Sequence, residues 1–276
     1  RVHQEAHRAR IGELDRVAHQ VEEDLLQAIG VAVDRIRQRA RGVHLDLKGV
    51  MFKPAYIPQL LADLAGQGIN TVLVEYEDLF PFSGGLALAR DPAVAWSPAI
   101  LHRFLAAARR QALEVIPLQQ CLGHLEYLLG WQRYRRFALD RKYPSVIDVT
   151  NPRALALIFE MLRQVIAAHP DSRYVHIGMD EAHSLVNHAK AQQREVLALF
   201  LEHLAALCTL CEQQGKTPVI WSDMLEDHLS PAALRRFAPF KDRVVLCPWD
   251  YGSKGTRIAA GRIAGFRVSR AWRAEP

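Results

Sequence analysis

Two adjacent carboxylates, Asp180 and Glu181, carry the clearest chemical signal in the sequence. They follow a short apolar stretch within residues 174–183, which read YVHIGMDEAH, and a helix-like stretch comes after them. In a barrel of alternating strands and helices, the carboxyl-terminal ends of the strands form the active site. The pair is therefore expected to bring acid chemistry to the end of a barrel strand.

Polar and aromatic side chains also follow the other predicted strands, each at its carboxyl-terminal end. They are Asp46 and Lys48; Glu75, Glu77 and Asp78; Gln119 and His124; His183; Trp221 and Asp223; and Trp249, Asp250 and Tyr251. Carboxylates and carboxamides hydrogen-bond hydroxyl groups, and flat indole rings match the apolar faces of a pyranose. The combination indicates a sugar ligand. Cleavage of a glycoside needs a general acid, and like-charge repulsion from Asp180 would favour the protonated form of Glu181.

Strand and helix patterns alternate along residues 41–276. Short apolar runs predict strands at residues 41–49, 71–78, 113–119, 174–178, 217–224 and 243–252, with a seventh at 265–269. Helices are predicted between them at residues 56–67, 97–111, 151–169, 192–214 and 231–237. Crossovers of this length connect parallel strands. The prediction is an α/β fold of the (β/α)8 TIM-barrel type, incomplete at the carboxyl-terminal end because seven strands are found rather than eight. The alternative is an open doubly wound sheet, whose usual GxGxxG phosphate loop is absent.

Residues 1–40 form a segment of their own before the predicted catalytic barrel of residues 41–276. Apolar residues recur there at spacings of three and four, which predicts one long amphipathic helix. They are Ile11, Leu14, Ala18, Val21, Leu25, Ala28 and Ala32. Because this seam is rich in alanine, packing against the same chain is favoured over a coiled coil.

The composition is that of an ordinary globular protein: 276 residues, half of them hydrophobic, with a formal net charge of +5. The arginines are mixed with acids, which predicts a solvated surface and no nucleic-acid partner. No apolar run long enough to cross a bilayer and no signal peptide are recognised, so no membrane partner is expected.

The chain has four cysteines, Cys121, Cys208, Cys211 and Cys247. Cys208 and Cys211 form a CxxC within a helical pattern, without the second ligand pair that a zinc ribbon needs, so buried thiols are expected. Sparse, irregular cysteines favour a reducing compartment, and the location predicted is cytoplasmic.

The segment HIGMDEAH resembles the H-x-G-x-D-E signature of the glycoside hydrolase family 20 β-N-acetylhexosaminidases. The resemblance is closest to the hexosaminidase D-like group. It extends, in the same order, over GVHLDLKG, NTVLVEYEDLFPF, EVIPLQQCLGHLEYLL and VIWSDML, and so covers about residues 41–225. The resemblance implies an exo-acting, retaining hydrolase of terminal β-linked N-acetylglucosamine or N-acetylgalactosamine. That family uses the acetamido oxygen of the substrate as nucleophile, an exception to the two-carboxylate scheme, and the reaction needs no cofactor.

The resemblance also implies roles for the acid pair and its surroundings. Glu181 would be the general acid and then the base for water, and Asp180 would hold the acetamido N–H. Trp221 and Trp249 would form walls around the acetamido methyl group, and Tyr251 would bond its carbonyl.

Further pocket positions follow from the same resemblance. Arg41 would bind ring hydroxyls, and His124 would form a polar link to the acid. The other substrate-binding candidates are Asp46, Asp78, His176 and Asp223. Two features depart from the family pattern: Met179 stands where a second glycine is common, and the pocket residues of the last strand are not in this chain.

Two other functions remain open at this stage. A metal-dependent hydrolase would use a ligand cluster of His176, Asp180, Glu181 and His183, but neither HxH nor HExxH occurs and no metal is expected. The second of these functions is that of a non-catalytic barrel that binds sugar. The residues do not indicate which hexosamine is preferred, nor the oligomeric state.

Overall fold

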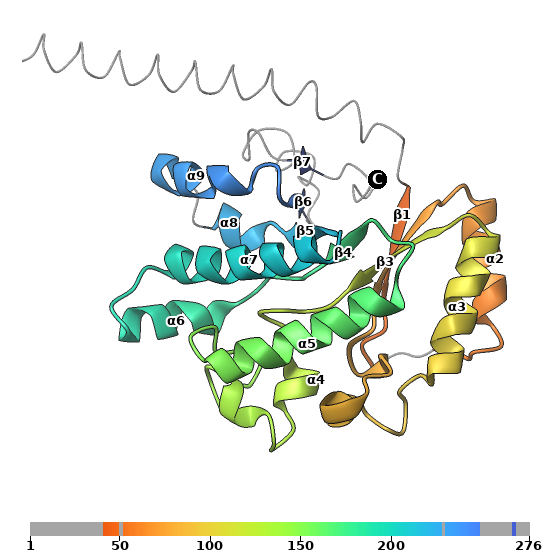
Figure 1. The fold of residues 1–276 in the computed structure, drawn as a ribbon, viewed down its shortest axis with the longest axis horizontal. Helices are drawn as coiled ribbons and strands as arrows, with labels where there is room; N and C mark the ends of the chain where they lie inside the picture. The colour runs from red at the N-terminus through yellow and green to blue at the C-terminus, as the bar shows by residue number, and fades with distance from the viewer. Residues whose placement is uncertain (1–40, 50–51, 228–229, 249–266, 269–276) are drawn as a thin grey trace, which may run out of the picture.

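The computed structural model describes residues 41–49, 52–227, 230–248 and 267–268. The predicted helix at residues 1–40 and the candidates Trp249, Asp250 and Tyr251 lie outside the described residues. Within them the chain forms a seven-stranded parallel sheet surrounded by helices (Figure 1). The strands are β1 (Gly42–Asp46), β2 (Thr71–Glu75), β3 (Glu114–Leu118), β4 (Tyr174–His176), β5 (Thr217–Trp221), β6 (Val245–Cys247) and β7 (Arg267–Val268).

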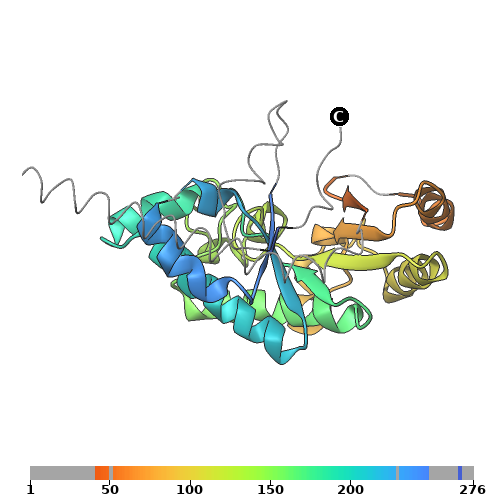
Figure 2. The ribbon, with the colours of Figure 1, turned by 90° about the horizontal axis from the view of Figure 1, so that it is seen from above.

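The strands pair in chain order from β1 to β7, and every neighbouring pair is parallel. A doubly wound sheet reverses its strand order at a switch point, so the order found here excludes that alternative for the described strands. The sheet curls, with its helices on the outside (Figure 2). The carboxyl-terminal ends of all the strands therefore lie along one curved edge.

Eight α-helices and four short 3₁₀ helices connect the described strands. They are α2 (Ile57–Gly66), α3 (Pro98–Arg110), α4 (Glu126–Leu129), α5 (Pro152–Ala168), α6 (His183–Ala191), α7 (Val196–Gln213), α8 (Asp223–Glu226), α9 (Pro231–Phe237), η1 (Glu77–Leu79), η2 (Gly84–Ala89), η3 (Arg135–Phe137) and η4 (Ala238–Phe240). The starts of α3, α5 and α9 are local in origin. Ser97, Asn151 and Ser230 each accept a hydrogen bond from a backbone N–H of the first turn, and proline follows each of them. These are favourable N-cap and first-turn residues.

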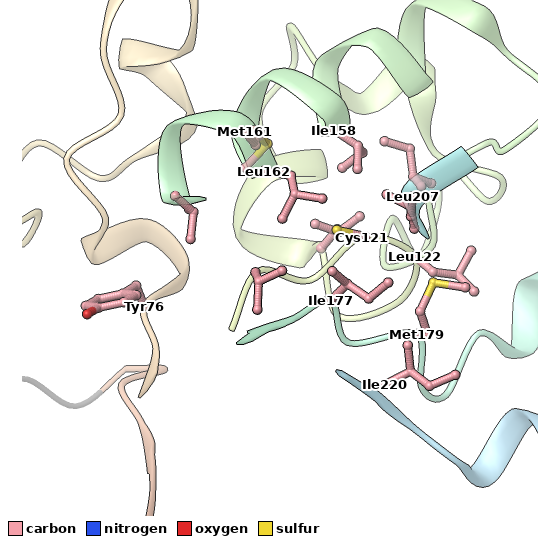
Figure 3. Packing of buried hydrophobic residues seen from close by; sticks show 14 of the residues in the cluster. Tyr76, Cys121, Leu122, Ile158, Met161, Leu162, Ile177, Met179, Leu207 and Ile220 are labelled. Carbon is pink, nitrogen blue, oxygen red and sulfur yellow. The ribbon is translucent and has the colours of Figure 1, made fainter. Parts of the chain in front are cut away.

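Alternate residues of β2 to β6 pack into two separate apolar clusters, as the period of two requires. The outward residues Val72, Val175, Ile177 and Ile220 join the large cluster under the helices. Figure 3 shows part of it between α5, α7 and the loops that follow β3 and β4. The inward residues form a smaller cluster on the concave face: Leu73, Ile116, Leu118, Val219, Trp221, Val245 and Cys247. The second cluster resembles the packed interior of a barrel.

Helix α7 is the helix predicted at residues 192–214. It begins four residues later than predicted, at Val196, and it follows the separate helix α6, which ends at Ala191. By length and composition α7 is apolar enough to cross a membrane, which the sequence reading had not recognised. Nine of its residues are buried, and it packs against β5. The burial and packing are those of a core helix, and Cys208 and Cys211 on it are buried free thiols.

Candidate active site

The loops that follow β1, β2, β3 and β4 bring charged residues together at the carboxyl-terminal edge of the sheet. His124, after β3, places Nε2 3.1 Å from Oδ2 of Asp180 and 3.3 Å from Oε2 of Glu181. Lys48, after β1, places Nζ 3.0 Å from Oε1 of Glu77, after β2. The Lys48 ammonium also lies close enough to lower the pKa of His124. Four successive loops thus contribute to one charged site.

The backbone that carries the acid pair is strained and tightly packed. After β4 the φ angles of Gly178, Met179 and Glu181 are +68°, +83° and +46°. Such angles cost a residue with a side chain about 1–2 kcal/mol, and strain of this kind concentrates at functional sites. A Cβ on Gly178 would lie 1.8 Å from Oε1 of Gln120, and one on Gly123 would lie 2.3 Å from the Asp180 carbonyl oxygen. Both glycines are therefore needed for the close approach of the β3 and β4 loops.

The two carboxylates have different surroundings. The Asp180 side chain is 11% exposed, and the Glu181 side chain is 43% exposed. Oδ1 of Asp180 is buried and has no hydrogen-bond partner among the described residues. The Glu181 backbone N–H donates to Oδ2 of Asp223, at 2.9 Å. One carboxylate thus has a free buried acceptor, and the other is open to solvent and held at its backbone by Asp223.

His124 supplies the positive charge beside this pair. Its hydrogen bond to Asp180 raises the pKa of His124 to about 9, against burial and the charge of Lys48, which lower it. At neutral pH the ring is therefore an imidazolium that faces both carboxylates. His124 itself has a φ of +52°, so its backbone is strained like that of Met179 and Glu181.

A polar layer lies on the concave face below the edge. His44 Nε2 lies 3.3 Å from Oε2 of Glu75, and Gln120 Nε2 donates to Oε1 of Glu75 at 2.9 Å. Burial would raise the pKa of Glu75, but these two partners outweigh it and lower the pKa. Trp221 is buried beside His44 and His176, with ring centroids 5.7 Å and 4.3 Å away.

His176 belongs to this layer and is held as a neutral ring. Burial lowers its pKa well below the usual value, and Nδ1 accepts a hydrogen bond from the Gly178 N–H at 3.1 Å. His183, by contrast, is exposed at the start of α6. In the part of the chain that the structure describes, no three His, Cys, Asp or Glu side chains converge as metal ligands. The ligand cluster considered from the sequence is therefore not assembled among the described residues.

The remaining candidates are placed in different regions. Asp46 lies at the site edge, where Oδ1 accepts the Lys48 N–H at 2.9 Å. Asp78 lies in η1, and the charge that acts on it is that of Asp91 rather than those of the acid pair. No hydrogen bond or ion pair joins it to His124 among the described residues.

The structure does not bring Arg41 to the site. Arg41 precedes β1 and so lies at the amino-terminal edge of the sheet, about 16 Å of strand away at ~3.3 Å per residue. Its backbone N–H donates to Oδ1 of Asn70, and its guanidinium lies against Gly68. The expectation that Arg41 binds ring hydroxyls is corrected accordingly, because the residue is at the opposite end of its strand.

Lys48, Glu77, Glu75 and Gln120 are charged or polar residues of the site that the sequence prediction did not assign. The first three had been noted at strand ends, but their pairing depends on loop geometry. One signal for this polar layer was available in the sequence. Residues two apart on a strand face the same side of the sheet. His44 and Asp46 are two apart on β1, and Leu73 and Glu75 are two apart on β2.

The chain resembles two proteins named hexosaminidase D, whereas no family model matches it. The Bos taurus protein is 33% identical over 240 residues, which cover 82% of this chain and 68% of the bovine protein. The Homo sapiens protein is 33% identical over 219 residues, covering 76% of this chain and 44% of the human protein. This chain therefore spans less than half of that human relative.

Solved structures with the same fold include the following three proteins. Flavobacterium johnsoniae chitobiase has a TM-score of 0.62 at 17% identity, covering 81% of this chain and 35% of that chain. A Vibrio harveyi family 20 exo-β-N-acetylglucosaminidase in complex with N-acetylglucosamine has a TM-score of 0.59 at 17% identity, with coverages of 84% and 41%. Dispersin B has a TM-score of 0.59 at 18% identity, with coverages of 84% and 71%. At these identities the likeness concerns the fold.

Proposed function

Because the chain belongs to the β-N-acetylhexosaminidases of glycoside hydrolase family 20, within the hexosaminidase D group, we propose that it releases terminal β-linked N-acetylglucosamine or N-acetylgalactosamine from glycosides. The observation that carries the proposal is the pairing of Asp180, buried with one free oxygen, with Glu181, open to solvent. Two carboxylates in unlike surroundings suit two unlike roles. The N-acetylglucosamine bound to the Vibrio harveyi enzyme supports this class of substrate.

The proposed reaction is retaining and uses the substrate's own acetamide. The acetamido oxygen attacks C1 while the glycosidic bond breaks, and Glu181 gives its proton to the departing oxygen. An oxazolinium forms on the sugar, and its ring carries the positive charge. Glu181 then takes a proton from water as that water attacks C1, which opens the ring and restores both the acetamide and the acid.

Asp180 is proposed to hold the acetamide in place. Its buried Oδ1 is an acceptor without a protein partner, and an unsatisfied buried acceptor costs about 1–3 kcal/mol. The acetamido N–H would satisfy it, and the carboxylate charge would stabilise the developing oxazolinium. His124 would fix both carboxylates, and Trp221 would face the sugar from the concave side.

The other assignments extend the same proposal. Asp223 would position Glu181 through its backbone N–H. Trp249 and Tyr251 would complete the acetamide pocket. All four cysteines are free and buried, which supports a reducing, cytoplasmic location. The curled sheet is the arrangement from which a (β/α)8 barrel is built, and we propose that architecture for the whole protein.

Hydrolysis of three aryl β-glycosides tests the function: the N-acetylglucosaminide, the N-acetylgalactosaminide and the glucoside. Turnover of an acetamido sugar without turnover of the glucoside is expected, because only the acetamide provides the nucleophile. Equal turnover of the glucoside would contradict substrate assistance. Sugar binding without turnover would favour the non-catalytic barrel instead.

A further inference from the structure

A groove that the proposed reaction does not use lies between α5, η2 and the segment around η3. Its volume is about 590 Å³, within the roughly 300–1,000 Å³ that small-molecule sites occupy. Three arginines, Arg133, Arg136 and Arg153, line it. Glu160 is the one carboxylate among the described residues of its lining. The groove therefore has an excess of positive charge.

The three guanidinium groups are not neutralised by the protein. Among the residues that the structure describes, none of them forms an ion pair with a carboxylate, and all three side chains are exposed. Glu160 is already engaged, because Oε1 accepts a hydrogen bond from Gln164 Nε2 at 3.0 Å and Oε2 lies 3.7 Å from Nη1 of Arg163. A cleft lined by charge of one sign concentrates ligands of the opposite sign. The expected ligand is therefore an anion.

Buried aromatic rings hold two of the arginines in place. Tight turns close from Trp131 to Tyr134 and from Tyr134 to Phe137, and residues three apart lie over one another in such turns. Tyr134 and Phe137 are buried, and their ring centroids lie 5.6 Å and 4.9 Å from the guanidinium carbons of Arg133 and Arg136. Both cations are thus positioned before a ligand arrives, which lowers the entropy cost of binding.

The other walls make the groove long and open. Arg153 and Gln164 both line it, and eleven residues of helix separate them by about 16 Å. The facing wall is backbone: a Cβ at Gly84 or Gly85 would meet nothing within 4 Å. The Tyr134 hydroxyl donates to the Gly85 carbonyl at 3.2 Å and so joins two walls. An elongated groove suits a chain better than a single small ion.

The walls of the groove belong to the loops that also build the acid site. On either side of His124, the Leu125 N–H donates to the Ser145 carbonyl at 2.9 Å, and the Ile147 N–H donates to the Leu122 carbonyl at 3.0 Å. These bonds tie the segment that carries two of the arginines to the His124 loop. The η2 wall follows η1 in the loop after β2. A glycan whose terminal sugar occupies the acid site would leave the rest of its chain at this edge of the sheet.

We propose that the groove binds sulfate or carboxylate groups of an acidic glycan, the chain from which the acid pair would release the terminal N-acetylhexosamine. The inference rests on the proposed function for the identity of the chain. Arginine forks bind the oxygens of carboxylates and of tetrahedral anions in pairs. Trp131 and Tyr143, in the same segment, are 45% and 65% exposed and offer flat faces to sugar rings. Charge and aromatic surface together match an acidic carbohydrate.

A chain without a terminal N-acetylhexosamine tests the groove by itself. A chondroitin 4-sulfate hexasaccharide with a uronate at its non-reducing end is titrated calorimetrically into the full chain and into Arg133→Gln, Arg136→Gln and Arg153→Gln. Each substitution should weaken binding by roughly 3–10-fold, between the effects of an exposed ion pair and of a charged hydrogen bond. Arg110→Gln is the matched control: this exposed arginine ends α3, outside the groove, and its loss should leave Kd unchanged.

Four results would overturn the proposal. Absence of binding to the wild type would exclude the site, and equal weakening in Arg110→Gln would mean that only the net charge acts. A short single-stranded DNA of equal charge that binds as tightly, with the same dependence on the arginines, would indicate a nucleic-acid site instead. Displacement of the hexasaccharide by inorganic sulfate at the same sulfate concentration would indicate a site for a free anion. Thermal unfolding of each variant verifies that the fold is retained.

Kinetics separate this proposal from the proposed function. On a sulfated chain that ends in N-acetylgalactosamine, the arginine variants should raise KM by the same roughly 3–10-fold. The kcat/KM for the aryl N-acetylgalactosaminide should stay within about twofold, as for independent sites. Arginine-dependent binding of the hexasaccharide without turnover of any glycoside would support the groove and contradict the proposed function. Turnover of the aryl glycoside without binding of the hexasaccharide would overturn the groove and leave the function intact.

Discussion

The division of labour that we propose for Asp180 and Glu181 rests on their surroundings rather than on their residue types. Glu181 is the exposed member of the pair, where a leaving group and water have access. Replacing it with glutamine keeps its size but removes the proton that we propose it exchanges. We expect Glu181→Gln to lower kcat by about 10²–10⁴-fold with little change in KM. Steady-state kinetics on the aryl N-acetylglucosaminide measure this, and unchanged turnover would remove Glu181 from the acid–base role.

Asp180 leads to a prediction that does not depend on activity. Its hydrogen bond is the largest cause of the raised pKa of His124. We expect Asp180→Asn to lower the pKa of His124 from about 9 toward the ordinary value of 6.5. An NMR titration of the imidazole reports this directly. A pKa that stays near 9 would mean that Glu181 alone holds the charge on His124.

Of the glycines compared among the described residues, Gly178 is the one at which an added Cβ would approach another atom most closely. A Cβ there would lie 1.8 Å from Gln120 Oε1, and φ is +68°. We expect Gly178→Ala to lower the free energy of unfolding by roughly 1–3 kcal/mol through strain and displacement of Gln120. Gly85→Ala is the matched control, because a Cβ at that position would meet nothing within 4 Å and no positive φ is found. Equal stability of the two variants in urea would show that the loop adjusts freely.

At the scale of elements, periodicity and turn residues were sufficient to predict the architecture. All seven predicted strands are present and parallel, each shorter than its apolar run, because the residues beyond β2 and β5 turn into η1 and α8. Helices α3 and α5 each begin with a proline that follows a capping residue, Ser97 or Asn151. Both begin within one residue of the predicted start. These signals are local, so one sequence is enough to read them.

The arrangement of side chains at the site was less predictable, for two physical reasons. Strand direction alone places Arg41 at the far edge, and a motif match does not take that into account. Backbone turns decide the rest. Glu77, at φ +48°, forms an ion pair with Lys48, whereas no hydrogen bond or ion pair joins the adjacent Asp78 to the acid pair among the described residues. Positive φ at residues other than glycine has no signature in composition or periodicity.

Helix α5 offers a test of an element's contribution. Asn151 caps it by accepting the Arg153 N–H, at 3.0 Å, and six residues of α5 are buried in the large apolar cluster. We expect Asn151→Ala to lower the free energy of unfolding by ~1 kcal/mol, because a first-turn N–H loses its partner. Asn151→Asp keeps an acceptor and should change stability little. A loss of the same size in both variants would indicate that the cap bond is not the cause.

For the whole molecule, buried ionisable groups determine how stability varies with pH. Burial lowers the pKa of His169 and of His203 to about 4. The folded state therefore binds fewer protons than the unfolded state between about pH 4 and 6.5, and stability rises over that range. Glu77 and His124 act in the opposite direction. Their folded pKa values, about 7 and about 9, lie above the ordinary 4.5 and 6.5.

Of His169, His203, Glu77 and His124, only His124 has a folded pKa well above 7. It is therefore the one of these four groups that loses its proton mainly above pH 7. Its stabilising contribution is complete below about pH 6.5 and is lost as pH rises through 9, because the folded state holds a proton that the unfolded state has released. We expect the free energy of unfolding to fall by ~1–2 kcal/mol between pH 7 and 9, after allowance for solvent screening. Urea unfolding of the wild type and of His124→Gln measures this, with the exposed His102→Gln as control. The decline should be smaller in His124→Gln, where buried thiols with raised pKa values still contribute near pH 9, and should persist in full in His102→Gln. A decline of equal slope in all three proteins would mean that the imidazolium between the two carboxylates does not stabilise the fold.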